Sequence, residues 1–180
     1  MNIDQRVLLQ ILSAYVSDKD ALWLLRQVIE SFYSSEKGIG LPLGNLTSQL
    51  FVNIYMNEFD QFVKHRLKAK YYIRYADDFV LLSDSRAWLE AQIPRITEFL
   101  ENHLHLHLHP QKLFIKTLAL GVDFLGWVHF PDHRVLRTAT KRRMLARVVS
   151  HPTEGTIDSY IGLLGHGNGR KLEKRIALEI

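Results

Sequence analysis

Two short runs rich in aromatic and β-branched residues, 71–75 (YYIRY) and 79–83 (FVLLS), flank Ala76-Asp77-Asp78. Runs of this composition on either side of a tight polar connection predict a β-hairpin with the aspartates at its turn. Their apolar content indicates that both strands are buried. A hairpin that ends in two adjacent carboxylates is the feature that most restricts what this chain can fold into.

The paired carboxylates of Asp77 and Asp78 favour a divalent cation. Adjacent carboxylates near a core repel each other unless a cation neutralises them. Mg²⁺ or Mn²⁺ binds oxygen ligands of this kind, and phosphoryl transfer uses such ions to hold the attacking and leaving oxygens. The alternative is an ordinary aspartate-rich surface turn, and the turn residues by themselves leave both interpretations open.

The rest of the chain mixes helical and extended patterns. Apolar residues recur at helical spacing over 5–15, 18–32, 47–63 and 85–102, and again from about residue 138 onward. Further strands are predicted over 104–109, 112–117 and 122–130. This order predicts an α+β fold, with an antiparallel sheet backed by helices and followed by a short helical segment.

Composition excludes several classes of protein. The chain has no cysteine, which removes disulfide scaffolds, thiol catalysis and cysteine zinc sites and suits a cytoplasmic protein. No apolar run approaches the roughly 18 residues that a membrane-spanning helix needs. We therefore expect no membrane partner.

Four histidines alternate with leucines between His103 and His109. Alternate histidines on one face of a strand can bind zinc. The interleaved leucines explain the pattern more simply, with leucines facing the core and histidines facing solvent.

Basic residues concentrate near the C-terminal end, although the formal net charge is only +4. Such clustering favours a polyanionic partner, and the alternative is a solvated helix face. The residues concerned are Lys141, Arg142, Arg143, Arg147, Arg170, Lys171, Lys174 and Arg175.

Four segments together resemble the conserved motifs of reverse transcriptases. Tyr75-Ala76-Asp77-Asp78 followed by an apolar strand resembles motif C. Upstream, residues 38–60 resemble motif B, the loop and helix under the template and incoming nucleotide. Downstream, residues 109–112 (HPQK) resemble motif D, and residues 122–127 (VDFLGW) resemble motif E, the primer grip. Order and spacing match from about residue 36 to residue 130.

The variant of motif B points to a subgroup. Group II intron and retroviral enzymes usually have Gln-Gly and Ser-Pro where this chain has Leu43-Gly44 and Ser48-Gln49. This form resembles the reverse transcriptases of diversity-generating retroelements and related bacterial enzymes. Residues 157–168 (IDSYIGLLGHGN) are similar to the thumb segment of the same group.

The resemblance implies catalytic roles for three residues. Asp77 and Asp78 would hold the metal ions, Mg²⁺ or Mn²⁺. Lys112 would approach the pyrophosphate leaving group, where a lysine neutralises developing charge and can donate a proton. Taken without the family, a lone lysine at this position would be solvated.

The resemblance also implies binding roles in three groups. Taken without the family, these positions would be a helix-capping loop, core packing and a solvated surface. The groups are nucleotide and template contacts (Gly44, Ser48, Gln49 and Tyr75), the primer grip (Phe124, Leu125 and Gly126) and phosphate contacts (Arg142, Arg143 and Arg147).

The implied activity is RNA-directed DNA synthesis by two-metal nucleotidyl transfer. Residues 1–132 would form a partial palm, and residues 133–180 a thumb-like helical segment. The implied partners are an RNA template, a DNA primer and deoxynucleoside triphosphates, in the cytoplasm of a prokaryote.

The catalytic aspartate of the family's motif A has no match. Residues 1–5 (MNIDQ) resemble only the end of that motif, with Asp4 at its last aspartate. We therefore expect a chain truncated at its N-terminus and inactive alone. The alternatives are a non-catalytic nucleic-acid-binding remnant, or half of a split polymerase that docks onto a fingers fragment or an accessory protein. A nucleotide cyclase fits poorly, because motif B and the thumb-like segment have no place in it.

Overall fold

The computed structural model describes residues 2–32, 34, 36–41 and 46–178. The chain divides into two compact units, Met1–Ile115 and Lys116–Ile180. Both contain helices and a short antiparallel sheet, so the expected mixture of helix and antiparallel strand is confirmed. The predicted boundary between palm and thumb, at 132/133, falls inside the second unit and stays a prediction about function.

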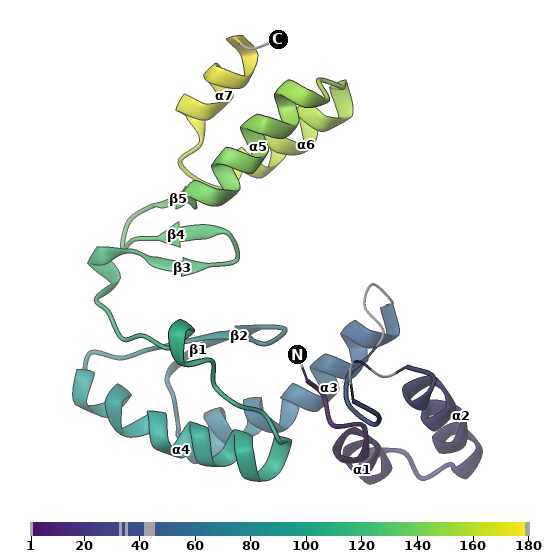
Figure 1. Ribbon diagram of the computed structural model, residues 1–180. Coiled ribbons are helices and arrows are strands. Elements are labelled where there is room, and N and C mark those ends of the chain that lie inside the picture. Colours follow the sequence, from purple (N-terminus) through teal and green to yellow (C-terminus); the bar gives the residue numbers. More distant parts are fainter. Residues whose placement is uncertain (1, 33, 35, 42–45, 179–180) are drawn as a thin grey trace. The chain divides into compact units, whose positions relative to one another are not determined.

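The first unit consists of a two-stranded hairpin with helices on one side of it (Figure 1). Its elements are α1 (Gln5–Tyr15), α2 (Lys19–Glu30), α3 (Leu46–Gln61), the π-helical turn η1 (Phe62–Arg66), β1 (Tyr71–Tyr75), β2 (Asp78–Leu82), α4 (Arg86–Leu104) and the 3₁₀ turn η2 (Pro110–Lys112).

An aromatic cluster fixes the hairpin against the helices of this unit. Phe59 of α3 is fully buried, and its ring centroid lies 4.8 Å from that of Phe79 in β2 and 6.1 Å from that of Tyr72 in β1. Phe99 of α4 joins the cluster, 6.2 Å from Phe59. One face of the hairpin therefore rests on α3 and α4, and the cluster sets the position of the turn.

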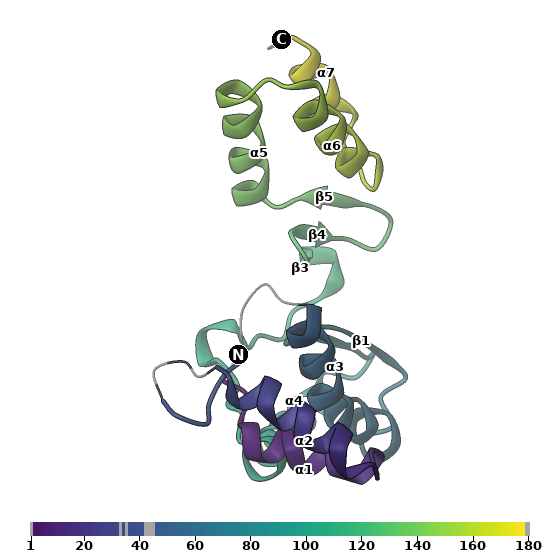
Figure 2. The same ribbon diagram turned by 90° about the vertical axis from the view of Figure 1, so that its right-hand side faces the viewer.

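The second unit is a three-stranded antiparallel sheet followed by three helices (Figure 2). Trp127 and Leu136 of the sheet pack with buried residues of the helices in one small core. The elements are the 3₁₀ turn η3 (Leu118–Leu120), β3 (Val122–Phe124), β4 (Trp127–His129), β5 (Arg134–Leu136), α5 (Thr138–Ser150), α6 (Glu154–Gly165) and α7 (Arg170–Leu178).

Two of the predicted strands are wrong. Residues 104–117 are all described, and they form no strand. The leucine at 104 extends the apolar stripe of α4, so the helix continues to that residue and ends at His105, which has a φ of 47°. Pro110 then starts a 3₁₀ turn that ends at Lys112, the first residue of the second predicted strand, and residues 113–117 after it form no strand either.

None of the helices in the described part of the chain combines the length and apolar character that crossing a membrane requires.

Candidate functional site

The turn between β1 and β2 is built from two residues, Ala76 and Asp77. Tyr75 pairs with Asp78 at the end of the ladder. Ala76 has a φ of 51°, in the left-handed region that costs a residue with a Cβ roughly 1–2 kcal/mol. The predicted hairpin with the aspartates at its turn is confirmed, and the turn conformation is strained.

Both aspartate side chains are exposed, which corrects the expectation of two buried strands. Residues alternate along β1, so that Tyr72 and Arg74 face α3 while Tyr75 is 64% exposed. Asp78 is opposite Tyr75 and shares that outer face. Because these carboxylates are exposed, burial does not require a cation to neutralise them. The case for a metal rests instead on two facts: the carboxylates are adjacent, and no side chain of the described residues pairs with them.

The carboxylates of Asp77 and Asp78 have no ion pair or side-chain hydrogen bond within the part of the chain that the structure describes. Two free, adjacent carboxylates fit Mg²⁺ or Mn²⁺, which are held by one or two carboxylates and complete their shells with water and substrate phosphates. No group of three metal-ligating side chains occurs among the described residues. The donor set thus suits an ion shared with a substrate better than a closed structural site.

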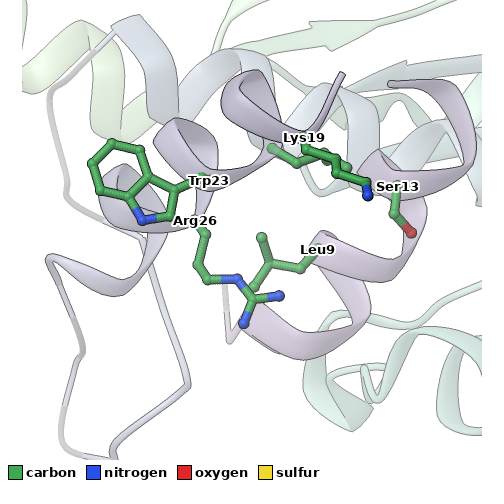
Figure 3. Close-up of a pocket in the computed structure, with 6 residues that line it drawn as sticks. Leu9, Ser13, Lys19, Trp23 and Arg26 are labelled. Carbon is green, nitrogen blue, oxygen red and sulfur yellow. The ribbon is translucent and has the colours of Figure 1, made fainter. Parts of the chain in front are cut away.

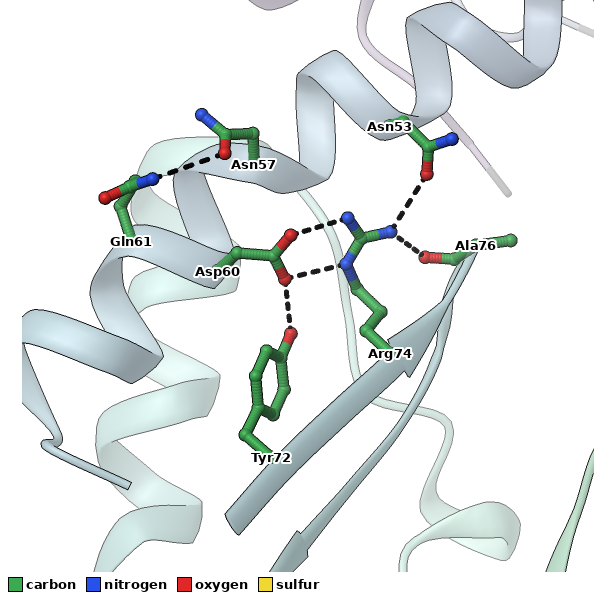
Figure 4. A network of polar contacts seen from close by, with 7 residues as sticks. All are labelled: Asn53, Asn57, Asp60, Gln61, Tyr72, Arg74 and Ala76. Carbon is green, nitrogen blue, oxygen red and sulfur yellow. Dashed lines mark hydrogen bonds and ion pairs between the residues drawn. The ribbon is translucent and has the colours of Figure 1, made fainter. Parts of the chain in front are cut away.

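A polar network lies behind this turn (Figure 4). Arg74 donates to both oxygens of Asp60, from Nε at 2.8 Å and from Nη2 at 2.6 Å. Its Nη1 donates to the carbonyl of Ala76 at 2.8 Å and to Asn53 Oδ1 at 3.3 Å. Tyr72 donates its hydroxyl to Asp60 at 2.6 Å. One guanidinium group thereby connects α3 to the backbone of the aspartate turn.

The network keeps Asp60 ionised. Burial alone would raise the pKa of its carboxyl, but hydrogen bonds from Arg74 and Tyr72 and the nearby positive charges hold that pKa below its usual value of 3.8. Burial and the hydrogen bond to Asp60 in turn raise the pKa of the Tyr72 hydroxyl far above its usual range. Asp60 is anionic, but its oxygens are occupied.

Asp4 is also occupied. It is buried, caps α1 by accepting from the backbone N–H of Arg6 at 2.8 Å, and contacts His105 Nδ1 at 2.9 Å. Burial works against ionisation, yet hydrogen bonds from His105 and the backbone lower the pKa of its carboxyl. Asp4 therefore has a structural role, as the residue that caps the N-terminus of α1.

Two of the four candidate nucleotide contacts, Ser48 and Gln49, lie in α3, and Tyr75 lies at the end of β1. Ser48 is buried in the first turn of the helix, and Gln49 beside it is exposed. Gly44 lies outside the described residues. Gly40 has a φ of 104° and donates its N–H to the carbonyl of Ile3.

Lys112 is exposed at the end of η2, in the same unit as the hairpin. No ion pair joins it to either turn aspartate in the described part of the chain.

The histidines that precede Lys112 in the sequence are exposed and have other contacts. His105 contacts Asp4, His107 contacts Glu101 at 3.1 Å, and His103 stacks on a phenylalanine. The leucines between them pack on the core, as the simpler interpretation predicted.

The candidate primer grip is a second hairpin with a two-residue turn. Phe124 pairs with Trp127, and both turn residues have positive φ, 53° at Leu125 and 82° at Gly126. That pattern is typical of the primed turns that match the twist of flanking strands. Leu125 is 47% exposed, so the turn presents an apolar side chain.

The candidate phosphate contacts lie on α5. Arg142, Arg143 and Arg147 are exposed, and none forms an ion pair within the described residues. Met144 and Val148 on the same helix are buried in the core of the second unit. The helix thus buries an apolar stripe and leaves its arginines available to an external anion.

Sequence reasoning missed the pairing of Asp60 with Arg74. A signal was present: Asn53, Asn57 and Asp60 follow helical spacing and form a polar stripe along α3. Tyr72 and Arg74 alternate on β1 and face that stripe. Nothing in the sequence, however, indicates that the helix and the strand meet.

A shallow hollow of about 380 Å³ lies between α1 and α2 (Figure 3). Its lining is apolar and basic and offers no carboxylate as a metal ligand. The lining residues are Leu9, Ser13, Lys19, Leu22, Trp23 and Arg26.

Comparison with known proteins places the hairpin in a sequence family. Residues 2–129 match the family model described as reverse transcriptase (RNA-dependent DNA polymerase). The match ends with β4, so that α5–α7 lie outside it. Protein YkfC of Escherichia coli (strain K12) is 27% identical over 191 aligned positions, which cover 84% of this chain and 48% of that relative. The chain spans about half the length of this relative.

Proposed function

This chain belongs to the reverse transcriptase (RNA-dependent DNA polymerase) family, and from that premise we propose that its β1–β2 turn holds the divalent cation of a nucleotidyl-transfer site. One observation carries the proposal. Asp77 and Asp78 are adjacent and exposed at a turn inside the matched region, and their carboxylates have no ion pair or side-chain hydrogen bond among the residues that the structure describes.

The proposed reaction is RNA-directed DNA synthesis by two-metal nucleotidyl transfer. The primer 3′-hydroxyl attacks the α-phosphate of a deoxynucleoside triphosphate, and pyrophosphate leaves. Bound Mg²⁺ or Mn²⁺ supplies charge stabilisation at the transferred phosphate. Asp77 and Asp78 hold the ion, and Lys112 supplies positive charge and a proton for pyrophosphate.

The remaining proposed contacts orient the nucleic acid. Residues 1–132 act as a partial palm, in which Gly44, Ser48, Gln49 and Tyr75 contact the nucleotide and template. The turn at Phe124, Leu125 and Gly126 supports the primer. Residues 133–180 act as a thumb-like segment whose α5 arginines bind phosphates of an RNA–DNA duplex. The motif B variant supports assignment to the diversity-generating retroelement group, in a prokaryotic cytoplasm.

We also propose that the 180-residue chain alone extends primers poorly. Two-metal chemistry in this family uses a further carboxylate from motif A. Asp4 and Asp60 are the candidates within the chain, and both are engaged, the first by the backbone of α1 and His105 and the second by Arg74. The missing carboxylate would come from a fingers and palm segment, covalently linked or in a separate subunit.

The alternative function is nucleic-acid binding without catalysis. The exposed arginines of α5 and the occupied states of Asp4 and Asp60 favour it for the isolated chain. It needs no metal at the β1–β2 turn.

Primer extension distinguishes the two functions. The chain is assayed with Mg²⁺, an RNA template, a DNA primer and deoxynucleotides, alone and with a fingers and motif A segment added by fusion or in trans. We expect little synthesis alone, restored synthesis with the segment, and loss of that synthesis in Asp77→Ala. Duplex binding without extension in every combination would favour the alternative. Strong extension by the chain alone would show that a carboxylate within the chain does the work of motif A, with Asp4 and Asp60 as the candidates.

A further inference from the structure

The Arg74 network is the part of the first unit that the proposed function leaves unused. The two strands of the hairpin carry two charged residues, Arg74 on β1 and Asp78 on β2. The side chain of Arg74 is only 10% exposed, although it lies two residues from an exposed turn. A guanidinium is kept in such a place only if its donors are satisfied.

The three guanidinium nitrogens divide between two partners on either side of Arg74, the carboxylate of Asp60 and the backbone of the turn. Nε and Nη2 bind Asp60 in a bidentate pair, while Nη1 binds the carbonyl of Ala76 at 2.8 Å. The planar fork fixes the two directions relative to each other, which an ammonium group cannot do. The position of α3 is thereby transmitted to the backbone of the turn.

The carbonyl that Arg74 binds belongs to the peptide that joins Ala76 to Asp77. Because a peptide unit is planar, fixing this oxygen also fixes the N–H of Asp77 and the direction in which its Cα leaves the turn. The turn needs such support, since Ala76 is held at a φ of 51° and a two-stranded hairpin is marginal by itself.

Asp60 has a second effect on the site. It pairs with Arg74, so the guanidinium brings no net positive charge to the turn. An unpaired arginine here would compete with a cation for Asp77 and Asp78. The carboxylate therefore supports the turn and leaves the aspartates free to bind a metal.

We propose that Arg74, anchored by Asp60, is a positioning residue that holds the Ala76–Asp77 peptide in the conformation from which Asp77 binds the divalent cation. This inference rests on the proposed metal site at the turn. It assigns to α3 a role in metal binding that does not involve contact with the metal.

The test measures Mn²⁺ affinity of the 180-residue chain by water-proton relaxation, together with amide hydrogen exchange at Ala76 and Asp77 without metal. Arg74→Met should lower the affinity about ten-fold, as loss of a residue supporting a metal ligand typically does, and should speed exchange at the turn. Arg86→Met is the matched control, because it removes an arginine–glutamate pair (2.8 Å) on the exposed surface of α4. That variant should keep wild-type affinity.

Two further variants separate positioning from stability. Arg74→Met removes the ion pair of Asp60 and leaves its hydrogen bond from Tyr72. The double variant Asp60→Leu/Arg74→Met removes both charges, so it should recover much of the thermal stability while Mn²⁺ affinity stays low. Arg74→Lys should also recover stability, because one ammonium can pair with Asp60. The single ammonium cannot bind Asp60 and the Ala76 carbonyl in both of the positions that the guanidinium nitrogens occupy. The Mn²⁺ affinity of Arg74→Lys should therefore remain below that of the wild type.

The outcomes distinguish this inference from the proposed function. If Asp77→Asn loses Mn²⁺ affinity while Arg74→Met and the double variant bind Mn²⁺ like the wild type, the positioning role is overturned and the metal site stands. If Asp77→Asn itself binds like the wild type, the metal site fails, and the positioning role fails with it.

Discussion

The hairpins β1–β2 and β3–β4 reverse over two residues each, and each places a residue with a Cβ at positive φ: Ala76 at 51° and Leu125 at 53°. What holds the two turns differs. The first is supported from behind by the Arg74 guanidinium and leaves its carboxylates exposed. The second is held by the backbone, since Gly126 accepts a hydrogen bond from the Arg137 N–H at 2.9 Å, and by packing of the adjacent strand.

Packing dominates at the second hairpin. Trp127 follows the turn directly, is buried, and lies so close to Gly167 that a Cβ there would be 2.2 Å from the indole ring. A turn that presents charge to a ligand cannot be held by apolar burial of its own residues, and a partly buried ion pair behind it provides an alternative. A turn that presents an apolar side chain needs no such pair.

The largest expected effect concerns the charges that accompany each hairpin. Arg142, Arg143 and Arg147 follow the second hairpin on α5, while the first ends in two aspartates. Reversing the three arginines to glutamate should weaken binding of an RNA–DNA hybrid about 100-fold at low salt and reduce the salt slope by about 0.7–0.9 per lost phosphate contact. Fluorescence anisotropy over a salt series measures both.

The control reverses Lys19, Arg26 and Lys37 of the first unit, which changes the net charge equally. Equal losses in the two triple variants would mean that the hybrid responds to net charge alone, and α5 would lose its assignment.

Packing at the second hairpin is tested by Gly167→Ala. The added methyl group meets the Trp127 ring, so we expect a loss of about 2–3 kcal/mol in the free energy of unfolding. Gly162→Ala is the control, because that glycine lies inside α6 with no atom within 4 Å of an added Cβ. It should gain up to about 1 kcal/mol. A tolerated Gly167→Ala in urea unfolding would refute the packing account.

The ion pair behind the first hairpin is tested by acid. Asp60→Asn should cost about 1–2 kcal/mol near neutral pH, because it removes charged hydrogen bonds. The pKa of Asp60 is lowered on folding, so its stabilisation is present above about pH 3.8 and is lost as the pH falls through the folded pKa. The stability difference between wild type and variant should therefore shrink on acidification in urea titrations at several pH values. A difference that grew on acidification would contradict the assigned sign.

The smallest effects concern the strain that the two turns share. Ala76→Gly and Leu125→Gly each relieve a positive φ but add backbone entropy to the unfolded chain. We expect a change between zero and a gain of about 1 kcal/mol for Ala76→Gly, and a lower value for Leu125→Gly, which loses a half-buried side chain. A loss above 1 kcal/mol for Ala76→Gly in thermal unfolding would mean that its turn is not strained.

Local pattern was enough to predict the first hairpin, because its β-rich runs and its turn are adjacent in sequence. Helix 5–15 is confirmed as Gln5–Tyr15 for the same reason. Alternation at 104–109 predicted a strand wrongly, since α4 extends through Leu104 and the segment after it finds no strand partner. The short strand β5 was not predicted, because three residues carry too little pattern.

The candidate site shows the same difference between local patterns, which the sequence reveals, and contacts that depend on the fold. Asp77 and Asp78 were recognised from neighbouring residues and from the motif order. The contact between Asp60 and Arg74 joins residues 14 positions apart on different elements, and only the packing of α3 on β1 brings it about. The expectation that both strands of the hairpin are buried was wrong, because helices of the described part of the chain pack against one face and leave the other exposed.

The measurement that tests the central claim most directly maps where Mn²⁺ binds. Mn²⁺ is titrated into the ¹⁵N-labelled 180-residue chain, with Asp77→Asn as the test variant and Asp84→Asn as a control that removes one exposed aspartate beyond β2. The account predicts that amide signals of residues 75–79 broaden first in the wild type and the control, and that Asp77→Asn sharply reduces this broadening. Equal broadening in all three proteins would show that the β1–β2 turn is an ordinary surface turn.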